Sequence, residues 1–177
     1  MTGAFHYVCT LDEAEALAGK HHKYWVSDCN CRVHRGPCKR SRADVCLQFA
    51  LHTAVDSLTK HVAKREEVDA ILKEAKDKHL VPRPFRNEKG GLDGICFCCD
   101  DCCGYFRGLH ELCDKGAMVE LTDAAICIDC GVCSGVCYFD ARDSSGEVLK
   151  VDREKCYGCG VCVDACAMKA ISMVPRN

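Results

Sequence analysis

The chain has 177 residues and a net charge of −2, which suits one ordinary domain or two small ones. Its 19 cysteines far exceed ordinary usage, so cysteine chemistry decides the class of protein. Residues 1–20 lack a basic start followed by an apolar run, and no stretch approaches the roughly 18 apolar residues of a membrane span. We therefore expect neither a secretory signal nor a transmembrane helix. This excludes a disulfide-rich secreted scaffold and predicts reduced, metal-binding thiols in the cytoplasm.

Charge is unevenly distributed along the chain. Residues 20–42 are basic, whereas residues 93–147 are rich in Asp and Glu. Two interpretations remain open. Either the two segments complement each other within one molecule, or the acidic segment forms a docking face for a redox partner protein with a basic patch.

Apolar periodicity predicts a largely helical N-terminal half. Helices are expected at residues 11–18, 44–61 and 65–79, because their apolar residues recur every three or four positions. Pro82 and Pro84 are expected to end the last helix, and residues 80–81 to form a short strand. Two helices and a strand resemble part of a winged-helix fold in outline, although the same pattern is common in small domains.

The first cysteine-rich stretch is interrupted by a Gly36-Pro37 loop and contains Cys29, Cys31, Cys38 and Cys46. The spacings match no zinc finger, but four thiols within eighteen residues of a reduced protein indicate a metal. Basic side chains in this stretch would offset the charge of bound thiolates and donate hydrogen bonds to sulfur. The stretch predicts an iron–sulfur cluster or a zinc site, supported by Arg32, Arg35, Lys39, Arg40 and Arg42.

The second stretch follows a polar turn at residues 87–91 and contains Cys96, Cys98, Cys99, Cys102 and Cys103. Adjacent side chains point in different directions, so Cys98 and Cys99 are not expected to bind the same edge of one metal centre. We expect a split, in which some of these thiols complete the site begun at Cys29 and others hold a separate site. With Cys113 the two stretches supply ten thiols, enough for two further clusters or for one with unusual ligation.

The C-terminal stretch contains the unit C-x2-C-x2-C-x3-C twice. In this spacing three cysteines wrap around one face of a 4Fe–4S cube, and the fourth cysteine of each run binds the other cluster. A zinc ribbon uses similar C-x2-C pairs but gives no reason for two interlocked runs of four. The spacing predicts two 4Fe–4S clusters, one held by Cys127, Cys130, Cys133 and Cys166, the other by Cys156, Cys159, Cys162 and Cys137.

On these motifs, residues 118–175 resemble the bacterial-type two-4Fe–4S ferredoxin family. That family usually has proline directly after the fourth cysteine, where this chain has Tyr138 and Ala167, a departure that bears on potential and solvent access more than on ligation. The resemblance implies a βαβ repeat with strands near residues 118–121, 147–151 and 170–174. The whole chain resembles a group of cysteine-rich iron–sulfur proteins of anaerobes, with a C-x-C-R segment and an I-C-x-C-C-x-x-C-C segment.

Together these patterns predict an α+β fold with two domains. Residues 1–117 are expected to form a mostly helical, cysteine-rich metal- or cluster-binding domain, and residues 118–177 a two-4Fe–4S ferredoxin domain. The favoured hypothesis is an iron–sulfur electron-transfer protein or redox subunit, passing single electrons between low-potential clusters and a redox partner protein. One or two further iron–sulfur clusters, or zinc, are expected in the N-terminal domain.

Two alternatives remain open. The first is an iron–sulfur reductase whose N-terminal cluster reduces a thiol, a disulfide or a small sulfur compound; the chain has no P-loop and no GxGxxG motif for a nucleotide. The second is a redox-sensing winged-helix regulator. No expected helix is conspicuously basic, so nucleic acid is not the expected partner. The sequence leaves catalytic residues and oligomeric state undetermined.

Overall fold

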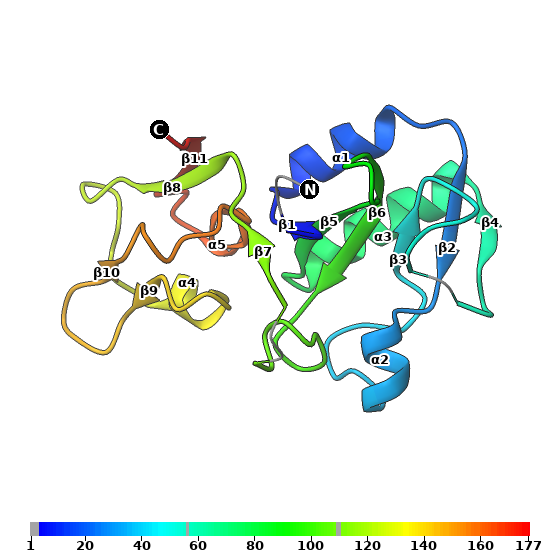
Figure 1. Cartoon of the computed structure of the whole chain (residues 1–177). Helices are drawn as coiled ribbons and strands as arrows, with labels where there is room; N and C mark the ends of the chain where they lie inside the picture. The colour runs from blue at the N-terminus through cyan, green and yellow to red at the C-terminus, as the bar shows by residue number, and fades with distance from the viewer. Residues whose placement is uncertain (1–3, 56, 109–110) are drawn as a thin grey trace.

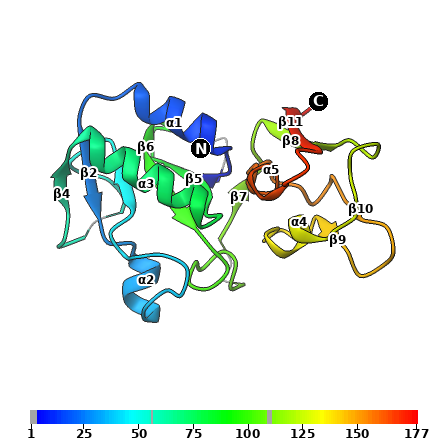
Figure 2. The same cartoon turned by 180° about the vertical axis from the view of Figure 1, so that it is seen from behind.

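The computed structural model describes residues 4–55, 57–108 and 111–177, which form two lobes side by side (Figures 1 and 2). The described part of the N-lobe (residues 4–114) contains a seven-stranded sheet, and that of the C-lobe (residues 118–177) contains two two-stranded sheets. None of the described helices is both long enough and apolar enough to cross a membrane.

The N-lobe sheet has the strand order β4-β2-β3-β6-β5-β1-β7. Its strands pair antiparallel except for β1 and β7, which are parallel. Helices α1 and α3 lie together in front of the strands in Figure 2. The elements of this lobe are β1 (His6–Tyr7), α1 (Leu11–Gly19), β2 (Tyr24–Ser27), α2 (Asn30–Arg35), β3 (Cys46–Gln48), β4 (His61–Ala63), α3 (Arg65–Asp77), β5 (Val81–Arg86), β6 (Leu92–Cys98) and β7 (Cys113–Asp114).

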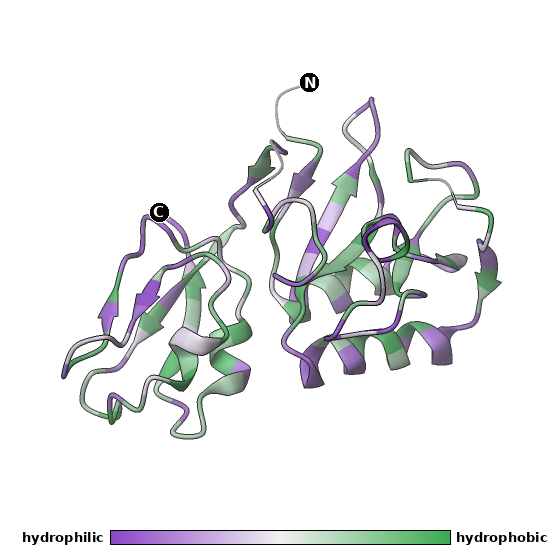
Figure 3. Cartoon of the chain, turned by 90° about the horizontal axis from the view of Figure 1, so that it is seen from below, coloured by the Kyte–Doolittle hydropathy of each residue, from purple (hydrophilic) through white to green (hydrophobic). Residues whose placement is uncertain are grey.

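The helices at residues 11–18 and 65–79 are confirmed as α1 and α3. Helix α1 begins with a capping box, in which the Thr10 hydroxyl accepts the Glu13 N–H at 3.1 Å and the Glu13 carboxylate accepts the Thr10 N–H at 2.8 Å. Figure 3 shows alternate purple and green bands along the longest helix, which is α3. Its apolar side packs into the main core with strand residues; the core includes Val68, Ile71, Leu72, Ala75, Val26, Leu47, Ile95 and Phe97.

The expectation of a mostly helical N-terminal domain is wrong, because this lobe is built on a sheet. The described residues of the segment where a helix was expected, 44–55 and 57–61, contain no helix; β3 lies there instead, and β4 begins at His61. The residues of β3 alternate in direction: Leu47 faces the helices and belongs to the main core, while Cys46 and Gln48 point to the other face. Both faces are buried, and the strand has only the residues Cys46, Leu47 and Gln48, so it is too short for its alternation to be distinguished from a helical pattern.

Helix α3 ends at Asp77, before Pro82 and Pro84, and both prolines lie inside β5. The N–H of Arg86 donates to the Phe5 carbonyl, so the backbone nitrogens at even-numbered positions of β5 face β1. Strand β1 has only two residues, of which His6 pairs with Phe85 of β5. Pro82 and Pro84 have no N–H group to donate. Because β1 is so short, few strand hydrogen bonds are possible at their positions, and little pairing is lost.

The C-lobe has the repeated architecture that the resemblance implied. Strand β8 pairs antiparallel with β11, and β9 with β10. Gly131 and Gly160 precede the two short helices with φ of 74° and 76°, a left-handed conformation that glycine adopts without strain. The elements are β8 (Met118–Thr122), α4 (Val132–Gly135), β9 (Arg142–Asp143), β10 (Lys150–Val151), α5 (Val161–Ala165) and β11 (Ile171–Pro175).

Close packing at Gly94 in β6 gives a test of the N-lobe sheet. A Cβ at this position would lie 2.3 Å from the Leu47 carbonyl oxygen and 2.5 Å from the Phe85 ring. Because a backbone oxygen must then shift, we expect Gly94→Ala to destabilise the protein by about 2 kcal/mol. Gly19→Ala is the control, since a Cβ added there would meet nothing within 4 Å and the residue is helical.

The measurement is the midpoint of anaerobic urea unfolding, followed by far-UV circular dichroism. Equal midpoints for Gly94→Ala and Gly19→Ala would contradict the packing of β3, β5 and β6 around Gly94.

Candidate metal centres

Four of the predicted C-lobe ligands line one enclosed cavity. Cys137, Cys156, Cys159 and Cys162 come from the end of α4, the β10–α5 connection and α5, and Phe139, Val161 and Met173 close the cavity with apolar atoms. The charges of Cys162, Cys137 and Cys156 all raise the pKa of the Cys159 thiol. The structure therefore brings together the four sulfurs that the crossed spacing assigned to one cluster.

Burial makes two of these thiols hard to ionise. It raises the pKa of Cys159 to about 12 and that of Cys162 to about 11. For Cys162 the guanidinium of Arg142 opposes this rise. Thiolate is the form that binds iron, so a metal bound in this cavity would have to displace both protons.

The other four predicted ligands range from buried to exposed, whereas the four that line the cavity are all half-buried. Cys133 is buried in α4, Cys127 and Cys166 are half-buried, and Cys130 is exposed. Cys127 lines a pocket of about 440 Å³ together with Asp129 and residues of β10 and its approach. Cys130 is thus the exposed one among the eight predicted C-lobe ligands.

Arg142 connects the two halves of the C-lobe. Its Nη1 donates to the Cys133 sulfur at 3.4 Å, and its Nη2 donates to the Glu120 carboxylate at 2.5 Å. Both side chains are almost fully inaccessible, and Glu120 is also held at 3.1 Å by Arg153. Burial lowers the pKa of Arg142, but the charges of Cys162, Glu120 and Cys133 raise it overall. One cation thus faces a sulfur from each ligand set.

In the N-lobe, six thiols form a continuous row that faces away from α1 and α3. Each of these side chains interacts with the next, in the order Cys29, Cys31, Cys103, Cys98, Cys96 and Cys46. Strand pairing creates part of the row, because the register that joins Leu47 to Ile95 places Cys46 opposite Cys96. Strand alternation adds Cys98 to the same face as Cys96. We call this the thiol row.

A buried cation also faces the thiol row. Arg83 in β5 is 1% exposed, and its Nη1 donates to the sulfurs of Cys103 at 3.2 Å and Cys98 at 3.7 Å. Its Nη2 donates to Glu111 at 2.6 Å, and its guanidinium carbon lies 4.5 Å from the centroid of the Tyr105 ring. The structure therefore supplies both a positive charge and hydrogen bonds to sulfur at this place.

Three further thiols form a compact group, which we call the thiol trio: Cys38, Cys99 and Cys102. Among the described residues their sulfurs lie within 4.8 Å of one another. The Cys38–Cys99 and Cys99–Cys102 sulfur distances are both 3.5 Å. The hydrogen bond from Cys102, with backbone N–H groups, lowers the pKa of Cys99 to about 5 and raises that of Cys102. Cys99 is thus held as a thiolate by its neighbours.

Arg32 lies between the row and the trio. It is 3% exposed, and its guanidinium donates hydrogen bonds to the neutral acceptors Ser41 Oγ, Arg42 O and Phe97 O. Its Nε finds no acceptor among the described residues. The negative charges that raise its pKa against the effect of burial are those of Cys29, Cys102 and Cys38. A buried guanidinium without a carboxylate partner requires these thiols as its counterions.

Tyr138, which stands where the ferredoxin family usually has proline, lies at the junction of the lobes. It packs against both hydrophobic clusters, and the Arg40 guanidinium carbon lies 5.2 Å from its ring centroid. Burial raises its pKa to about 12, and the charges of Cys99 and Cys159 contribute. Tyr138 therefore lies between the thiol trio and the enclosed C-lobe cavity.

The structure regroups the predicted N-terminal ligands. The sequence suggested that Cys29, Cys31, Cys38 and Cys46 begin one site, but Cys38 belongs to the trio and the other three to the row. Cys98 and Cys99 fall in different groups. Cys113 is half-buried and lies near Arg83. The remaining cysteine, Cys9, is buried beside Cys159.

Sequence reasoning missed the two buried arginines Arg83 and Arg142, which resemble ordinary surface cations in the sequence. The only available signal was position: Arg83 alternates with two prolines in a strand, and Arg142 follows a cluster loop. Of the basic residues that were singled out, Arg32 faces thiols, whereas Arg40 pairs with Asp100 at 2.5 Å and Arg42 with Glu74 and Asp44 at 2.8 Å. The basic and acidic segments thus complement each other at least at Arg40.

Comparison with known proteins supports the C-lobe assignment. Residues 120–167 match the family model described as the 4Fe-4S dicluster domain. No curated protein and no solved structure gives a significant match to this chain. The matched segment spans both cysteine runs. The match supports iron–sulfur electron transfer in general as the chemistry of the C-lobe.

Proposed function

We propose that this protein passes single electrons between two 4Fe–4S clusters in the C-lobe, a further iron–sulfur centre on the thiol row and a redox partner protein. The observation that carries the proposal is the cavity lined by Cys137, Cys156, Cys159 and Cys162, which joins ligands from both cysteine runs. The other C-lobe ligands are Cys127, Cys130, Cys133 and Cys166. When bound, the clusters would supply one-electron redox chemistry, and no protonatable pair is needed for it.

The chain's own residues hold and bias this chemistry. Glycines 131 and 160 let the two loops turn into α4 and α5, so that each run presents its sulfurs from one side. Apolar side chains of Phe139, Val161 and Met173 exclude water from the inner site. Arg142 holds a positive charge against Cys133, which stabilises the more negative, reduced form of a centre bound there.

The outer site is suited to contact with a partner. Cys130 is exposed, and so are four apolar side chains nearby in the fold or sequence, Ile126, Ile128, Val132 and Val148, which we call the edge patch. The N–H of Leu149 donates to the Asp129 carboxylate at 2.9 Å, which brings the chain around Val148 to this loop. Several exposed acidic residues lie close to the patch residues along the sequence: Asp123, Asp129, Asp140, Asp143 and Glu147. An apolar patch with an acidic border fits a redox protein with a basic face.

The inner site faces the N-lobe. Tyr138 follows directly after the ligand Cys137 and packs against the N-lobe through Arg40. Electrons would therefore pass from the row and trio region through the inner C-lobe site to the outer one, or in the reverse direction. On the row, Cys29, Cys31, Cys98 and Cys103 are proposed as ligands, with Cys46 and Cys96 as alternates on the same face, and Arg83 offsets their charge.

The two alternative functions receive less support. A reductase would need an N-lobe cluster that a substrate can reach, whereas Cys46, Cys98 and Cys103 of the row are buried. A winged-helix regulator would need a basic recognition helix, but α3 carries five acidic residues against three basic ones.

Iron and sulfide counting on anaerobically purified protein tests the proposal. We expect about twelve irons per chain, because each 4Fe–4S centre holds four. Cys31→Ser and Cys98→Ser should each lose about four irons and keep the two-cluster EPR spectrum of the reduced C-lobe. Cys9→Ala is the control and should lose none. About eight irons in the unmodified protein would overturn the row centre, and a protein with no iron would overturn the whole proposal.

Arg142 should set the reduction potential of the C-lobe. We expect Arg142→Met to lower the potential by tens of millivolts, because the positive charge that favours the added electron is removed. Arg142→Lys keeps the charge and should shift it less. Arg153→Met is the matched control. Arg153 binds the same Glu120, but its side chain is about half exposed and it donates no hydrogen bond to a described cysteine sulfur. The measurement is an EPR-monitored redox titration, and an unchanged potential in Arg142→Met would contradict the assigned role.

The acidic border of the edge patch should guide partner docking. Cytochrome c serves as a basic acceptor protein, and we expect Glu147→Lys to slow its reduction about threefold at low ionic strength, with the difference disappearing in high salt. Glu15→Lys makes the same charge change on the exposed side of α1 and should have little effect. Stopped-flow absorbance gives the rates. Equal slowing by both variants would place the docking face elsewhere.

A further inference from the structure

The sulfur spacing in the thiol trio fits a single metal ion. Two of its sulfur–sulfur distances are 3.5 Å, and none exceeds 4.8 Å. A tetrahedral ion with metal–sulfur bonds of about 2.3 Å requires sulfurs about 3.8 Å apart. In a 4Fe–4S cube each thiolate binds a different iron, so the sulfurs must stand farther apart. The trio therefore has the dimensions of a mononuclear site.

The trio offers three ligands and leaves a fourth position. Among the described residues, no other Cys, His, Asp or Glu joins the group. Asp101 is adjacent in sequence to Cys102, and its carboxylate interacts with the Cys38 thiol and accepts the Lys39 backbone N–H at 2.9 Å, but it lies outside the group whose ligand atoms are all within 4.8 Å of one another. Three protein ligands with one open position is the arrangement of catalytic and ligand-binding zinc sites, whereas structural sites are closed by four.

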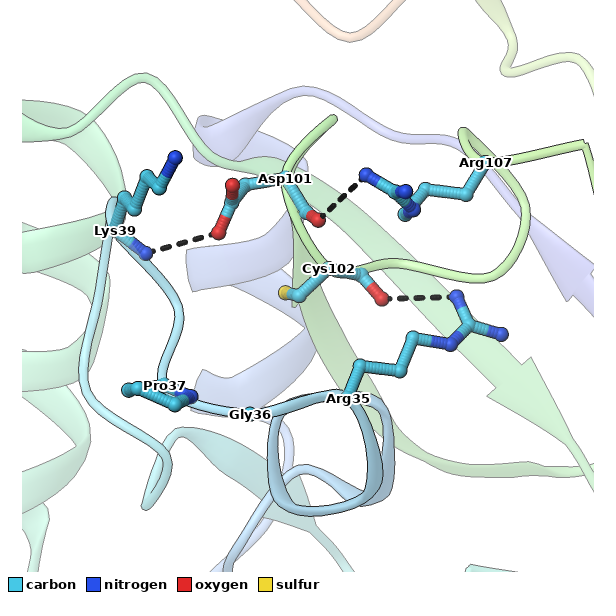
Figure 4. Close-up of a pocket in the computed structure, with 7 residues that line it drawn as sticks. All are labelled: Arg35, Gly36, Pro37, Lys39, Asp101, Cys102 and Arg107. Atoms are coloured by element: carbon cyan, nitrogen blue, oxygen red, sulfur yellow. Dashed lines mark hydrogen bonds between the residues drawn. The ribbon is translucent and has the colours of Figure 1, made fainter.

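A pocket of about 570 Å³ reaches the trio at Cys102 (Figure 4). Besides Cys102 it is lined by the residues that flank Cys38, namely Gly36, Pro37 and Lys39, and by Arg35, Asp101 and Arg107. The fourth position therefore has an open route to solvent through a defined cavity.

The pocket carries unbalanced positive charge. Figure 4 shows Arg35 and Arg107 approaching the 101–102 backbone together; Arg35 donates to the Cys102 carbonyl at 3.0 Å and Arg107 to the Asp101 carbonyl at 3.3 Å. Within the described part of the chain neither arginine forms an ion pair, and Asp101 is the only carboxylate among the lining residues. With Lys39, three cations outnumber one carboxylate, which suits an anionic ligand.

From this geometry we infer that Cys38, Cys99 and Cys102 bind one divalent, zinc-like ion, and that its fourth position takes a small thiol that also carries a carboxylate or phosphate. The ligand's sulfur binds the ion as thiolate and releases its proton to solvent, while its second anionic group binds Arg35, Arg107 and Lys39. A soft sulfur donor suits an ion already held by three thiolates. The site shares no ligand with the C-lobe clusters or with the thiol row.

Metal and sulfide analysis of the full chain tests the metal. Relative to the unmodified protein, Cys38→Ser and Cys99→Ser should each lose one metal ion per chain and no acid-labile sulfide. Loss of several irons together with sulfide would show a cluster and overturn the inference, and so would no loss in either variant. Because the EPR spectrum of the C-lobe clusters is recorded on the same samples, failure of the trio site is distinguishable from failure of the proposed electron-transfer function.

Calorimetric titration with mercaptoacetate tests the ligand, with acetate as the probe that lacks sulfur. We expect mercaptoacetate to bind the unmodified protein and acetate to bind at least about tenfold more weakly. Arg107→Ala should weaken mercaptoacetate binding about tenfold at unchanged metal content, since one charge-assisted contact is lost. Lys20→Ala, an exposed cation outside the pocket, should leave it unchanged. Equal affinity for the two probes, or no effect of Arg107→Ala, would overturn the assignment.

Discussion

The metal-binding regions of this protein depend on cations buried against sulfur. Arg32, Arg83 and Arg142 are each almost fully inaccessible, and each faces cysteine sulfurs from inside the fold. Arg83 and Arg142 also pair with the carboxylates of Glu111 and Glu120, whereas Arg32 has no carboxylate partner among the described residues. Burying a guanidinium without a counterion costs several kcal/mol, so the position of Arg32 depends on negative charge on the thiols that face it. Burial opposes ionisation of those thiols, and a bound metal would restore it. A metal bound by these thiols would therefore couple folding to metal loading at Arg32.

Strand geometry explains why the N-lobe thiols divide as they do, and why the sequence revealed only part of the division. That Cys98 and Cys99 point apart follows from their adjacency alone, and in the structure they fall in different groups. Which distant thiols join each of them depends on pairing between strands: Cys46 meets Cys96 only because β3 lies beside β6. The helix expected at residues 44–61 left this pairing out, because a strand of only three residues is too short to show an alternating pattern.

The C-lobe was predictable to a greater depth because its information is local. Two runs of four cysteines, with glycines ahead of each short helix, specify loop, helix and ligand positions without long-range pairing. The cysteine spacing does not show which other side chains surround the predicted ligands. Glu120 and Arg142 are 22 residues apart and meet only after β8 and β9 form. Tyr138 stands in the sequence where the ferredoxin family usually has proline. In the structure it packs against both hydrophobic clusters and so connects the enclosed C-lobe cavity to the N-lobe.

Arg32 makes the two N-lobe groups interdependent. It is close enough to Cys29 of the row and to Cys102 and Cys38 of the trio for all three to raise its pKa, and its hydrogen bonds to Arg42 and Phe97 go to neutral carbonyls. A single cation that stabilises two anionic centres must couple them. When negative charge is added to one centre, the cation stabilises that centre more and the other centre less. An electron arriving on the row would therefore weaken the hold of the trio on a further anion, and an anion bound at the trio would disfavour reduction of the row. In the proposed scheme, the shared arginine is the physical link between ligand occupancy at the trio and electron transfer at the row.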